Sequence, residues 1–197
     1  AIHPDDRGFE LEINRGEYRL RTKILVNSAG LQADAVAAMA GMDVAKAGYR
    51  LHYGKGDYFY ASPPPPIRHL IYPVPPRGYE SLGIHATMDL GGRVRFGPDI
   101  EYVQRIDYRV DEGKAASFFA AVTRYLPKLS LEALHPDMSG IRPKLQGPGE
   151  PPRDFILCEE SPSGFQGLIN LIGIESPGLT CAVSIAEYVR GLVTSAL

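Results

Sequence analysis

Two strand–turn–helix units, far apart in the sequence, enclose a long β-rich segment, and this order constrains the fold most. The first unit, residues 23–41, runs from the apolar KILVN through the small residues SAG into an alanine-rich helix. The second is GLINLIGI, followed by an apolar helix that starts at Leu179. Strands that alternate with helices are typical of parallel α/β sheets. The sequence therefore predicts a chain that leaves one α/β layer and later returns to it.

The remaining segments have the pattern of short antiparallel strands and one helix. Residues 9–13 and 18–26 alternate apolar and polar positions around NRGE, which predicts a hairpin. Prolines interrupt the strand-like runs of residues 49–99, so we expect short or edge strands there, among them 69–75 and 81–88. Residues 110–129 change to helical spacing and stop at Pro127, and SGIRPKLQGPGEPPRDFILCEE then predicts a loop and a strand. The fold class is mixed, α/β with α+β character.

Composition excludes several classes of protein. The 197 residues are 44% hydrophobic and 22% charged, with a formal net charge of −2, which gives no reason to expect a nucleic-acid partner. No apolar run approaches the roughly 18 residues of a membrane helix, and we find no signal-peptide pattern. Cys158 and Cys181 lie far apart, so we expect two buried free thiols, a reducing compartment and a cytoplasmic location.

ESPGLT, residues 175–180, places a tight turn before the last helix. The unpaired N–H groups and the dipole of a helix start favour an anion there by about 0.3–2 kcal/mol. The alternative is that Ser176 simply caps the helix. The helix itself is predicted to be packed in a core through an apolar stripe of Leu179, Val183, Ala186, Val189, Leu192 and Val193.

Two further segments carry side chains suited to a carboxylate substrate. In SGIRPK, Arg142 precedes a proline that favours extended backbone, and a guanidinium held in this way binds carboxylates bidentately. A surface pair between Arg142 and Asp137 is the alternative, and Lys144 is expected to be solvated. His85, in LGIHATMDLGG, is a candidate proton acceptor, although a lone histidine in a strand is more often structural.

Glycine-rich segments provide weaker indications. Gly54 and Gly56 surround Lys55 in YGKGDYFY, which is typical of a strand that a ligand approaches, or equally of a bulge or turn. NSAG, residues 27–30, ends an apolar strand where open α/β sheets bind nucleotides. The five histidines show no metal-ligand spacing, so no metal site is predicted.

The order of several segments resembles that of the C-terminal half of the D-amino-acid-oxidase-like FAD-dependent oxidoreductases. These segments are, in chain order, KILVNSAG, KGDYF, LIYPVP, LGIHATMDLGGRVRFGPD, SGIRPK and GIESPGLT. Within that family the segments are most similar to the L-2-hydroxyglutarate dehydrogenase/oxidase branch. The resemblance implies a partial Rossmann-like FAD-binding domain in residues 1–47 and a β-rich substrate domain in residues 48–150. Residues 151–197 would return to the FAD domain and end in its last helix.

The resemblance also implies roles for single residues. His85 would take the hydroxyl proton of a small 2-hydroxy acid while the α-hydrogen leaves as hydride to the flavin, and Arg142 would bind the substrate carboxylate. Lys55 and Tyr72 would be further substrate contacts. The implied cofactor contacts are Ser28, Ala29, Gly30, Gly56, Ser176, Pro177, Gly178, Leu179 and Thr180. The turn at residues 176–180 would face the N1–C2=O edge of the flavin.

The G-x-G-x-x-G segment that holds the FAD pyrophosphate in this family is absent from the chain. Because the chain starts without methionine in strand-like sequence, we expect an N-terminal half of the same protein to be missing; the alternative is a degenerate relative of the family. The chain alone should then bind FAD poorly, be inactive, and expose apolar surface that drives self-association. Two alternatives are open: an FAD-dependent amine or amino-acid oxidase, and a non-catalytic module that binds a carboxylate or a partner chain.

Overall fold

The structure is a computed structural model that describes residues 1–74 and 83–197. These residues form two compact units, one of residues 1–53 and 142–197 and the other of residues 54–141. The resemblance implies boundaries after residues 47 and 150. The unit boundaries fall instead inside two long strands, β5 (His52–Ala61) and β9 (Leu134–Lys144). A boundary within a continuous strand leaves no mark in the composition.

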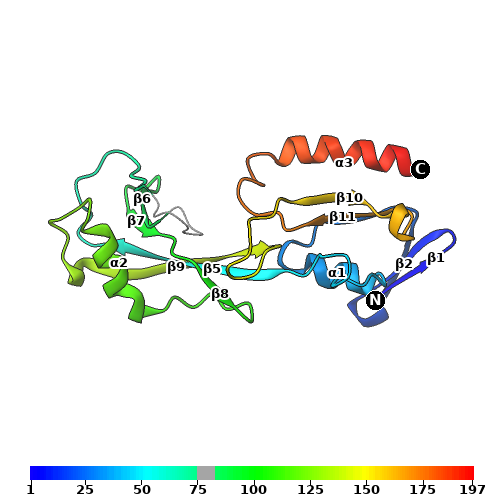
Figure 1. Ribbon diagram of the computed structural model, residues 1–197, viewed down its shortest axis with the longest axis horizontal. Helices are drawn as coiled ribbons and strands as arrows, with labels where there is room; N and C mark the ends of the chain where they lie inside the picture. Colours follow the sequence, from blue (N-terminus) through cyan, green and yellow to red (C-terminus); the bar gives the residue numbers. More distant parts are fainter. Residues whose placement is uncertain (75–82) are drawn as a thin grey trace. The chain divides into compact units, whose positions relative to one another are not determined.

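The first unit contains a small three-layer α/β structure (Figure 1). Its sheet has the order β10-β11-β4, formed by Ile156–Glu159, Leu168–Ile172 and Leu25–Asn27. Strands β4 and β11 are parallel with Asn27 opposite Asn170, and β10 is antiparallel to β11. Helix α1 (Ala33–Met39) contacts β4 and β11, and helix α3 (Ala182–Ala196) contacts β10 and β11 from the other face. The predicted return of the chain to its first α/β layer is confirmed.

An antiparallel sheet of β1 (Ile2–Asp5), β2 (Gly8–Ile13) and β3 (Tyr18–Thr22) completes the first unit. The predicted hairpin is confirmed, with Leu11 opposite Leu20 in the register of β2 and β3. Phe9 enters a core with Ala37, Ala40, Met42 and Leu168. Ion pairs join the polar residues of the sheet, including Arg19 with Glu12 at 2.9 Å. Alternation along the strands therefore separates an apolar face from a charged one.

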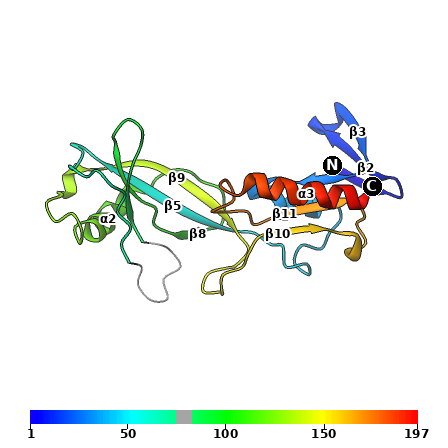
Figure 2. The ribbon, with the colours of Figure 1, turned by 90° about the horizontal axis from the view of Figure 1, so that it is seen from above.

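The second unit contains a larger, mostly antiparallel sheet (Figure 2). Its order is β6-β7-β5-β8, with β9 paired to β5, and β6, β7 and β8 comprise His85–Met88, Val94–Gly97 and Glu101–Val103. Helix α2 (Ala115–Val122) packs on it through a core that contains Phe59, Phe96, Phe118, Val122 and Leu134. SGIRPK belongs to β9 rather than to the predicted loop. An isolated bridge joins Ile71 to Ala86, and the parts of the predicted strands 69–75 and 81–88 within 75–82 lie outside the described residues.

Short 3-10 turns connect several of these elements. They comprise Asn14–Gly16, Gly30–Gln32, Glu112–Lys114, Leu131–Ala133 and Ser161–Ser163.

Helix α3 differs from its prediction at its start and in its burial. It begins at Ala182, with Cys181 as N-cap, and residues 176–181 form a turn before it. None of its residues is buried, and Val183 is 75% exposed, while Leu179, in the preceding turn, is 94% exposed. The predicted core helix is therefore wrong for this chain, because α3 packs with one side on short strands and the apolar sequence extends around to the other side.

The cysteines are also less buried than predicted. Cys158 and Cys181 are free thiols, as expected, but both are partly exposed. Burial raises the pKa of Cys158, and the neighbouring carboxylates Glu160 and Glu159 raise it further. A raised pKa keeps this thiol protonated and poorly nucleophilic. Within residues 1–74 and 83–197, no helix combines the length and hydrophobicity that a membrane span requires.

Candidate active site

In the first unit, two predicted cofactor segments meet at one edge of the parallel strand pair. The turn of residues 28–30 follows the end of β4, and residues 173–180 follow the end of β11. Because Asn27 is opposite Asn170, both segments leave the same carboxyl edge, where open α/β sheets bind ligands. Ser28, Ala29 and Gly30 are exposed there. Gly30 has a φ of +58°, and a Cβ at this position would meet nothing within 4 Å.

A buried polar network below the turn holds it in place. Asn27 accepts a hydrogen bond from the Ala29 amide at 3.3 Å and donates to Asn170 Oδ1 at 2.8 Å. Asn170 donates in turn to the buried Glu160 at 3.0 Å, which also accepts from the Tyr49 hydroxyl at 2.8 Å. Burial, with the adjacent Glu160 carboxylate, raises the pKa of Tyr49. The sequence did not lead us to predict this network, although Asn27 and Asn170 are polar residues in otherwise apolar strands.

The turn after β11 contains two hydrogen bonds within its own backbone. The Gly178 amide donates to the Glu175 carbonyl at 2.6 Å, and the Cys181 amide donates to the Pro177 carbonyl at 3.1 Å. A Cβ at Gly178 would lie 2.3 Å from Ile174 Cγ2, so the turn itself requires glycine. The side chain of Ser176 does not cap α3, which has Cys181 at the N-cap without a side-chain bond. The turn before α3 is not the first turn of this helix. Its exposed residues are Ser176, Pro177, Leu179 and Thr180.

Arg142 lies on β9 and is joined to the residue that precedes this turn. Its Nη1 donates to Glu175 Oε2 at 3.1 Å, while Lys144 Nζ donates to Glu175 Oε1 at 3.0 Å. The alternative pair of Arg142 with Asp137 is not formed, because Asp137 binds Arg95 and also lies near Arg93. The expected solvated state of Lys144 is wrong, since its side chain is 9% exposed.

In the second unit, the structure brings together the predicted base and one predicted substrate contact. His85 begins β6 and is 8% exposed. The ring of Tyr72 lies against its imidazole, with 4.0 Å between the ring centroids and a tilt of 39°. Tyr72 is itself more than half exposed. The structure thus places these two predicted residues against each other, and the role of His85 as a proton acceptor stays a prediction.

Lys55 and Gly56 on β5 have partners within the second unit. The Lys55 amine donates to the carbonyl oxygen of Arg109 and lies 3.5 Å from Asp57 Oδ1. A Cβ at Gly56 would lie 2.5 Å from Pro98 Cβ, so close packing accounts for this glycine. The roles predicted for Lys55 in substrate binding and for Gly56 in cofactor binding stay predictions.

A partly buried charge cluster lies beside Lys55. Lys114 Nζ binds the carboxylates of Asp57, Asp99 and Glu101 at 2.8, 2.9 and 2.8 Å. Asp57 is fully buried, and its Oδ1 has no hydrogen-bond partner among the described residues. Lys114 occupies the position from which a metal cation would bind these carboxylates. The described part of the chain contains no group of histidine, cysteine or acidic residues suited to a metal.

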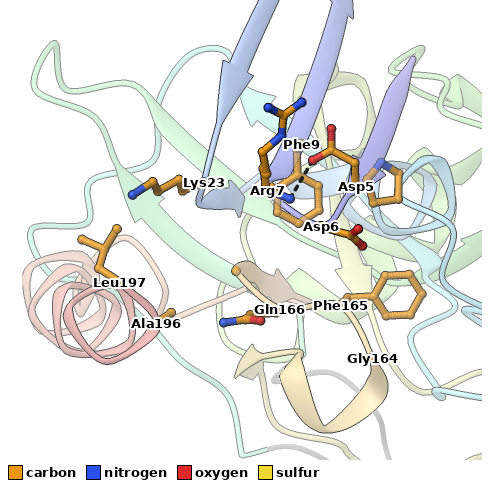
Figure 3. A pocket seen from close by; sticks show the side chains of 13 residues that line it. Asp5, Asp6, Arg7, Phe9, Lys23, Gly164, Phe165, Gln166, Ala196 and Leu197 are labelled. Carbon is orange, nitrogen blue, oxygen red and sulfur yellow. Dashed lines mark hydrogen bonds between the residues drawn. The ribbon is translucent and has the colours of Figure 1, made fainter.

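One cavity, of about 410 Å³, is lined by Pro73 and Ile84, the neighbours of Tyr72 and His85 in the chain, and two others lie elsewhere. The cavity in Figure 3, of about 590 Å³, is lined by Asp5–Phe9, Gly164–Gly167 and the last two residues of the chain, among others. In the second unit, a cavity of about 650 Å³ is lined by Lys55, Glu101 and Arg109, among others. Of the described residues that line these two cavities, Lys55 alone is a predicted site residue.

The model of the FAD dependent oxidoreductase (DAO) family matches residues 1–192, and the chain belongs to this family.

Curated relatives indicate the branch of the family. The chain is 41% identical over 190 residues to the mitochondrial L-2-hydroxyglutarate dehydrogenase of Arabidopsis thaliana, an alignment that covers 88% of this chain and 38% of the relative. It is 26% identical over 218 residues to the L-2-hydroxyglutarate dehydrogenase of Escherichia coli K12, covering 92% of this chain and 50% of the relative. The chain is thus a homologue that spans about half the length of these relatives or less.

Solved structures support the fold. Glycine oxidase from Geobacillus kaustophilus matches with a TM-score of 0.72 at 20% identity, over all of this chain and 47% of that chain. L-alpha-glycerophosphate oxidase from Mycoplasma pneumoniae matches with a TM-score of 0.75 at 18% identity, over 98% of this chain and 49% of that one. The predicted mixed α/β fold class is therefore confirmed. The chain matches about half of each of these oxidases.

Proposed function

We propose that the complete protein is an FAD-dependent oxidoreductase that oxidises a small 2-hydroxy acid, such as L-2-hydroxyglutarate, to the 2-oxo acid. One observation carries the choice of a carboxylate substrate. Arg142 presents a guanidinium that is 45% exposed, beside the exposed turn that follows a parallel strand. The identity with L-2-hydroxyglutarate dehydrogenases supports the 2-hydroxy acid.

The residues present are compatible with part of an FAD site. The open space at Gly30 and the turn of residues 176–180, which is exposed except at Gly178, lie at the carboxyl edge of β4 and β11, where a cofactor can approach the backbone closely. Ser28, Ala29 and Gly30 would hold the nucleotide part, and the turn of residues 176–180 would contact the flavin. The solved relatives are about twice as long as this chain, and we infer that such a further segment supplies the pyrophosphate loop.

The first unit would accordingly be the C-terminal part of a Rossmann-like FAD domain. Strand β4 is at the end of the sheet order β10-β11-β4. An apolar parallel strand with one open edge is a site at which a further strand can pair. The second unit, with its larger antiparallel sheet, would be the substrate domain.

FAD, when bound, supplies the acceptor for the two electrons removed from the substrate. Arg142 would hold the substrate carboxylate by charge-assisted hydrogen bonds and so orientate the hydroxyl-bearing carbon. The imidazole of His85 would accept the hydroxyl proton, and Tyr72 would keep the ring in place. Lys55, which lines a cavity in the second unit, is a further candidate contact for the substrate.

The test is an assay of the complete protein with several substrates. We expect a yellow protein with a flavin absorption spectrum that reduces an artificial electron acceptor with L-2-hydroxyglutarate. Lactate, glycine and sarcosine separate a 2-hydroxy acid dehydrogenase from an amine oxidase. A colourless protein that binds 2-hydroxy acids without turnover would support the non-catalytic module and overturn the proposal, as would reduction by the amines alone.

Replacing Arg142 should weaken the binding of carboxylate substrates. We expect Arg142→Ala to raise KM for the 2-hydroxy acid by roughly 10- to 100-fold, because a charge-assisted hydrogen bond contributes about 1.5–3 kcal/mol. Arg142→Lys should recover part of the loss, since it keeps the charge without the planar fork. Steady-state kinetics measure both effects.

The matched control is Arg190→Ala, which removes an exposed arginine from α3. It should leave KM within about twofold of the parent value, as substitutions at exposed positions usually do. An unchanged KM in Arg142→Ala would remove this residue from the carboxylate site.

A further inference from the structure

Glu175 binds two cations with different oxygens of one carboxylate. Its Oε2 accepts from Arg142 at 3.1 Å, its Oε1 accepts from Lys144 at 3.0 Å, and its side chain is 14% exposed. All three residues belong to the first unit. Two positive charges and one negative charge leave the group with a net charge of +1. The group can therefore balance one carboxylate of a ligand.

The two cations differ in their access to solvent. Lys144 is 9% exposed, whereas Arg142 is 45% exposed. The contact with Glu175 uses Nη1 of Arg142. A guanidinium has five N–H donors in a fixed plane, so a partner that holds one end fixes the direction of the rest. Arg142 can thus present the remainder of its guanidinium to a ligand, while Lys144 is the buried counter-ion of Glu175.

Glu175 also begins the predicted flavin turn. Its carbonyl oxygen accepts the Gly178 amide at 2.6 Å, and Ser176 follows it directly in the chain. One residue is therefore bonded to β9 through its side chain and to the turn through its backbone. A movement of the carboxylate must change either the direction of Arg142 or the path of the turn.

We propose that Glu175 is a positioning residue for Arg142, with Lys144 as its counter-ion. Glu175 sets the direction of the guanidinium and its distance from the turn of residues 176–180. The net charge of the three residues makes the site selective for a single carboxylate group at this point of the substrate. The proposal rests on the proposed function for the identity of that carboxylate, while the link between β9 and the turn rests on the contacts alone.

Glu175→Gln tests the proposal, because a positional effect and a simple charge effect have opposite signs. If only charge matters, loss of a negative charge beside Arg142 tightens the binding of a carboxylate and lowers KM. If position matters, the neutral amide no longer satisfies both cations, and KM rises. We expect KM to rise about tenfold, the effect of one weakened charge-assisted bond, with a smaller change in kcat. Glu175→Asp, which keeps the charge on a shorter side chain, should give an intermediate KM.

A second measurement needs neither cofactor nor turnover. In hydrogen exchange on this chain, the amides of Gly178 and Cys181 should exchange several times faster in Glu175→Gln than in the parent, because the anchor of the turn is lost. Glu187→Gln, a matched change at an exposed position of α3, should leave both amides unchanged. If Glu175→Gln folds poorly, Lys144→Met replaces it in this test. It should also speed the exchange of the Gly178 and Cys181 amides.

The outcomes separate this inference from the proposed function. If the complete parent protein oxidises no 2-hydroxy acid, the proposed function fails, and the hydrogen exchange alone judges the positioning role. If the parent is active and Glu175→Gln lowers KM or leaves it unchanged, the positioning role is overturned and the proposed function stands. Unchanged exchange at Gly178 and Cys181 also overturns it.

Discussion

Lys114→Met should lower the free energy of unfolding by about 3–5 kcal/mol, the usual effect of removing one partner from a buried ion pair. Lys114 binds Asp57, Asp99 and Glu101, and Asp57 is fully buried. Methionine has a similar length but no charge, so three carboxylates would lose their shared cation while Asp57 stays out of reach of water. Urea denaturation of the purified chain measures the loss.

The matched control for this variant is Lys128→Met, which changes an exposed lysine of the same unit. It should change the free energy of unfolding by less than about 0.5 kcal/mol. Adding Asp57→Asn to Lys114→Met should restore part of the stability, because the buried charge is then removed together with its partner. A loss no greater in Lys114→Met than in Lys128→Met would show that the cluster does not stabilise the fold.

The same interaction predicts a pH dependence. Burial alone lowers the pKa of Lys114, but hydrogen bonds to Asp57, Glu101 and Asp99 more than offset this, and the net pKa is raised above its usual 10.5. A group with a raised pKa in the folded state contributes its full stability below the unfolded value and loses it as the pH rises further. The difference in unfolding free energy between the parent and Lys114→Met should therefore be constant near neutral pH and shrink above about pH 10.5.

Much of the fold could be predicted because the patterns are local. Alternation identified the β2–β3 hairpin, and the change to a 3.6-residue period identified α2. The start and the burial of α3 could not be predicted in the same way. Its apolar residues occur on more than one side, and the surface that each side meets is a property of the tertiary structure. Burial depends on which elements are present, which a period within one helix does not encode.

The candidate site shows the same division between local and distant information. The segments around Arg142 and Ser176 were identified from their glycines, prolines and charge, and in the structure Glu175 joins them. Glu175 itself was missed, because a glutamate next to a turn has no local mark that distinguishes it from a solvated one. Its two partners lie 33 and 31 residues away in the sequence. Such a pairing becomes visible only when β9 and the turn are placed together.

His85→Ala in the complete protein should reduce kcat by roughly 100- to 10,000-fold, the range that general acid–base catalysis contributes, with little change in KM. The imidazole is 8% exposed and lies 4.0 Å from the ring of Tyr72, measured between centroids. Alanine would leave the carboxylate contact proposed for Arg142 unchanged while removing the proposed acceptor of the hydroxyl proton. Turnover, and not substrate binding, should therefore be lost, and stopped-flow measurement of flavin reduction would locate the defect in the chemical step.

A second histidine provides a matched control. His135 on β9 also lies against a tyrosine, Tyr60, with 5.2 Å between ring centroids and a tilt of 38°. His135→Ala should therefore reproduce the loss of a histidine–tyrosine contact in the same unit without affecting proton transfer, and kcat should stay within about threefold of the parent value. Added imidazole should restore part of the activity of His85→Ala, because it can enter the space left by the side chain and accept the proton. If both variants lose activity equally and imidazole restores neither, His85 contributes packing, and the proton acceptor must be sought elsewhere in the protein.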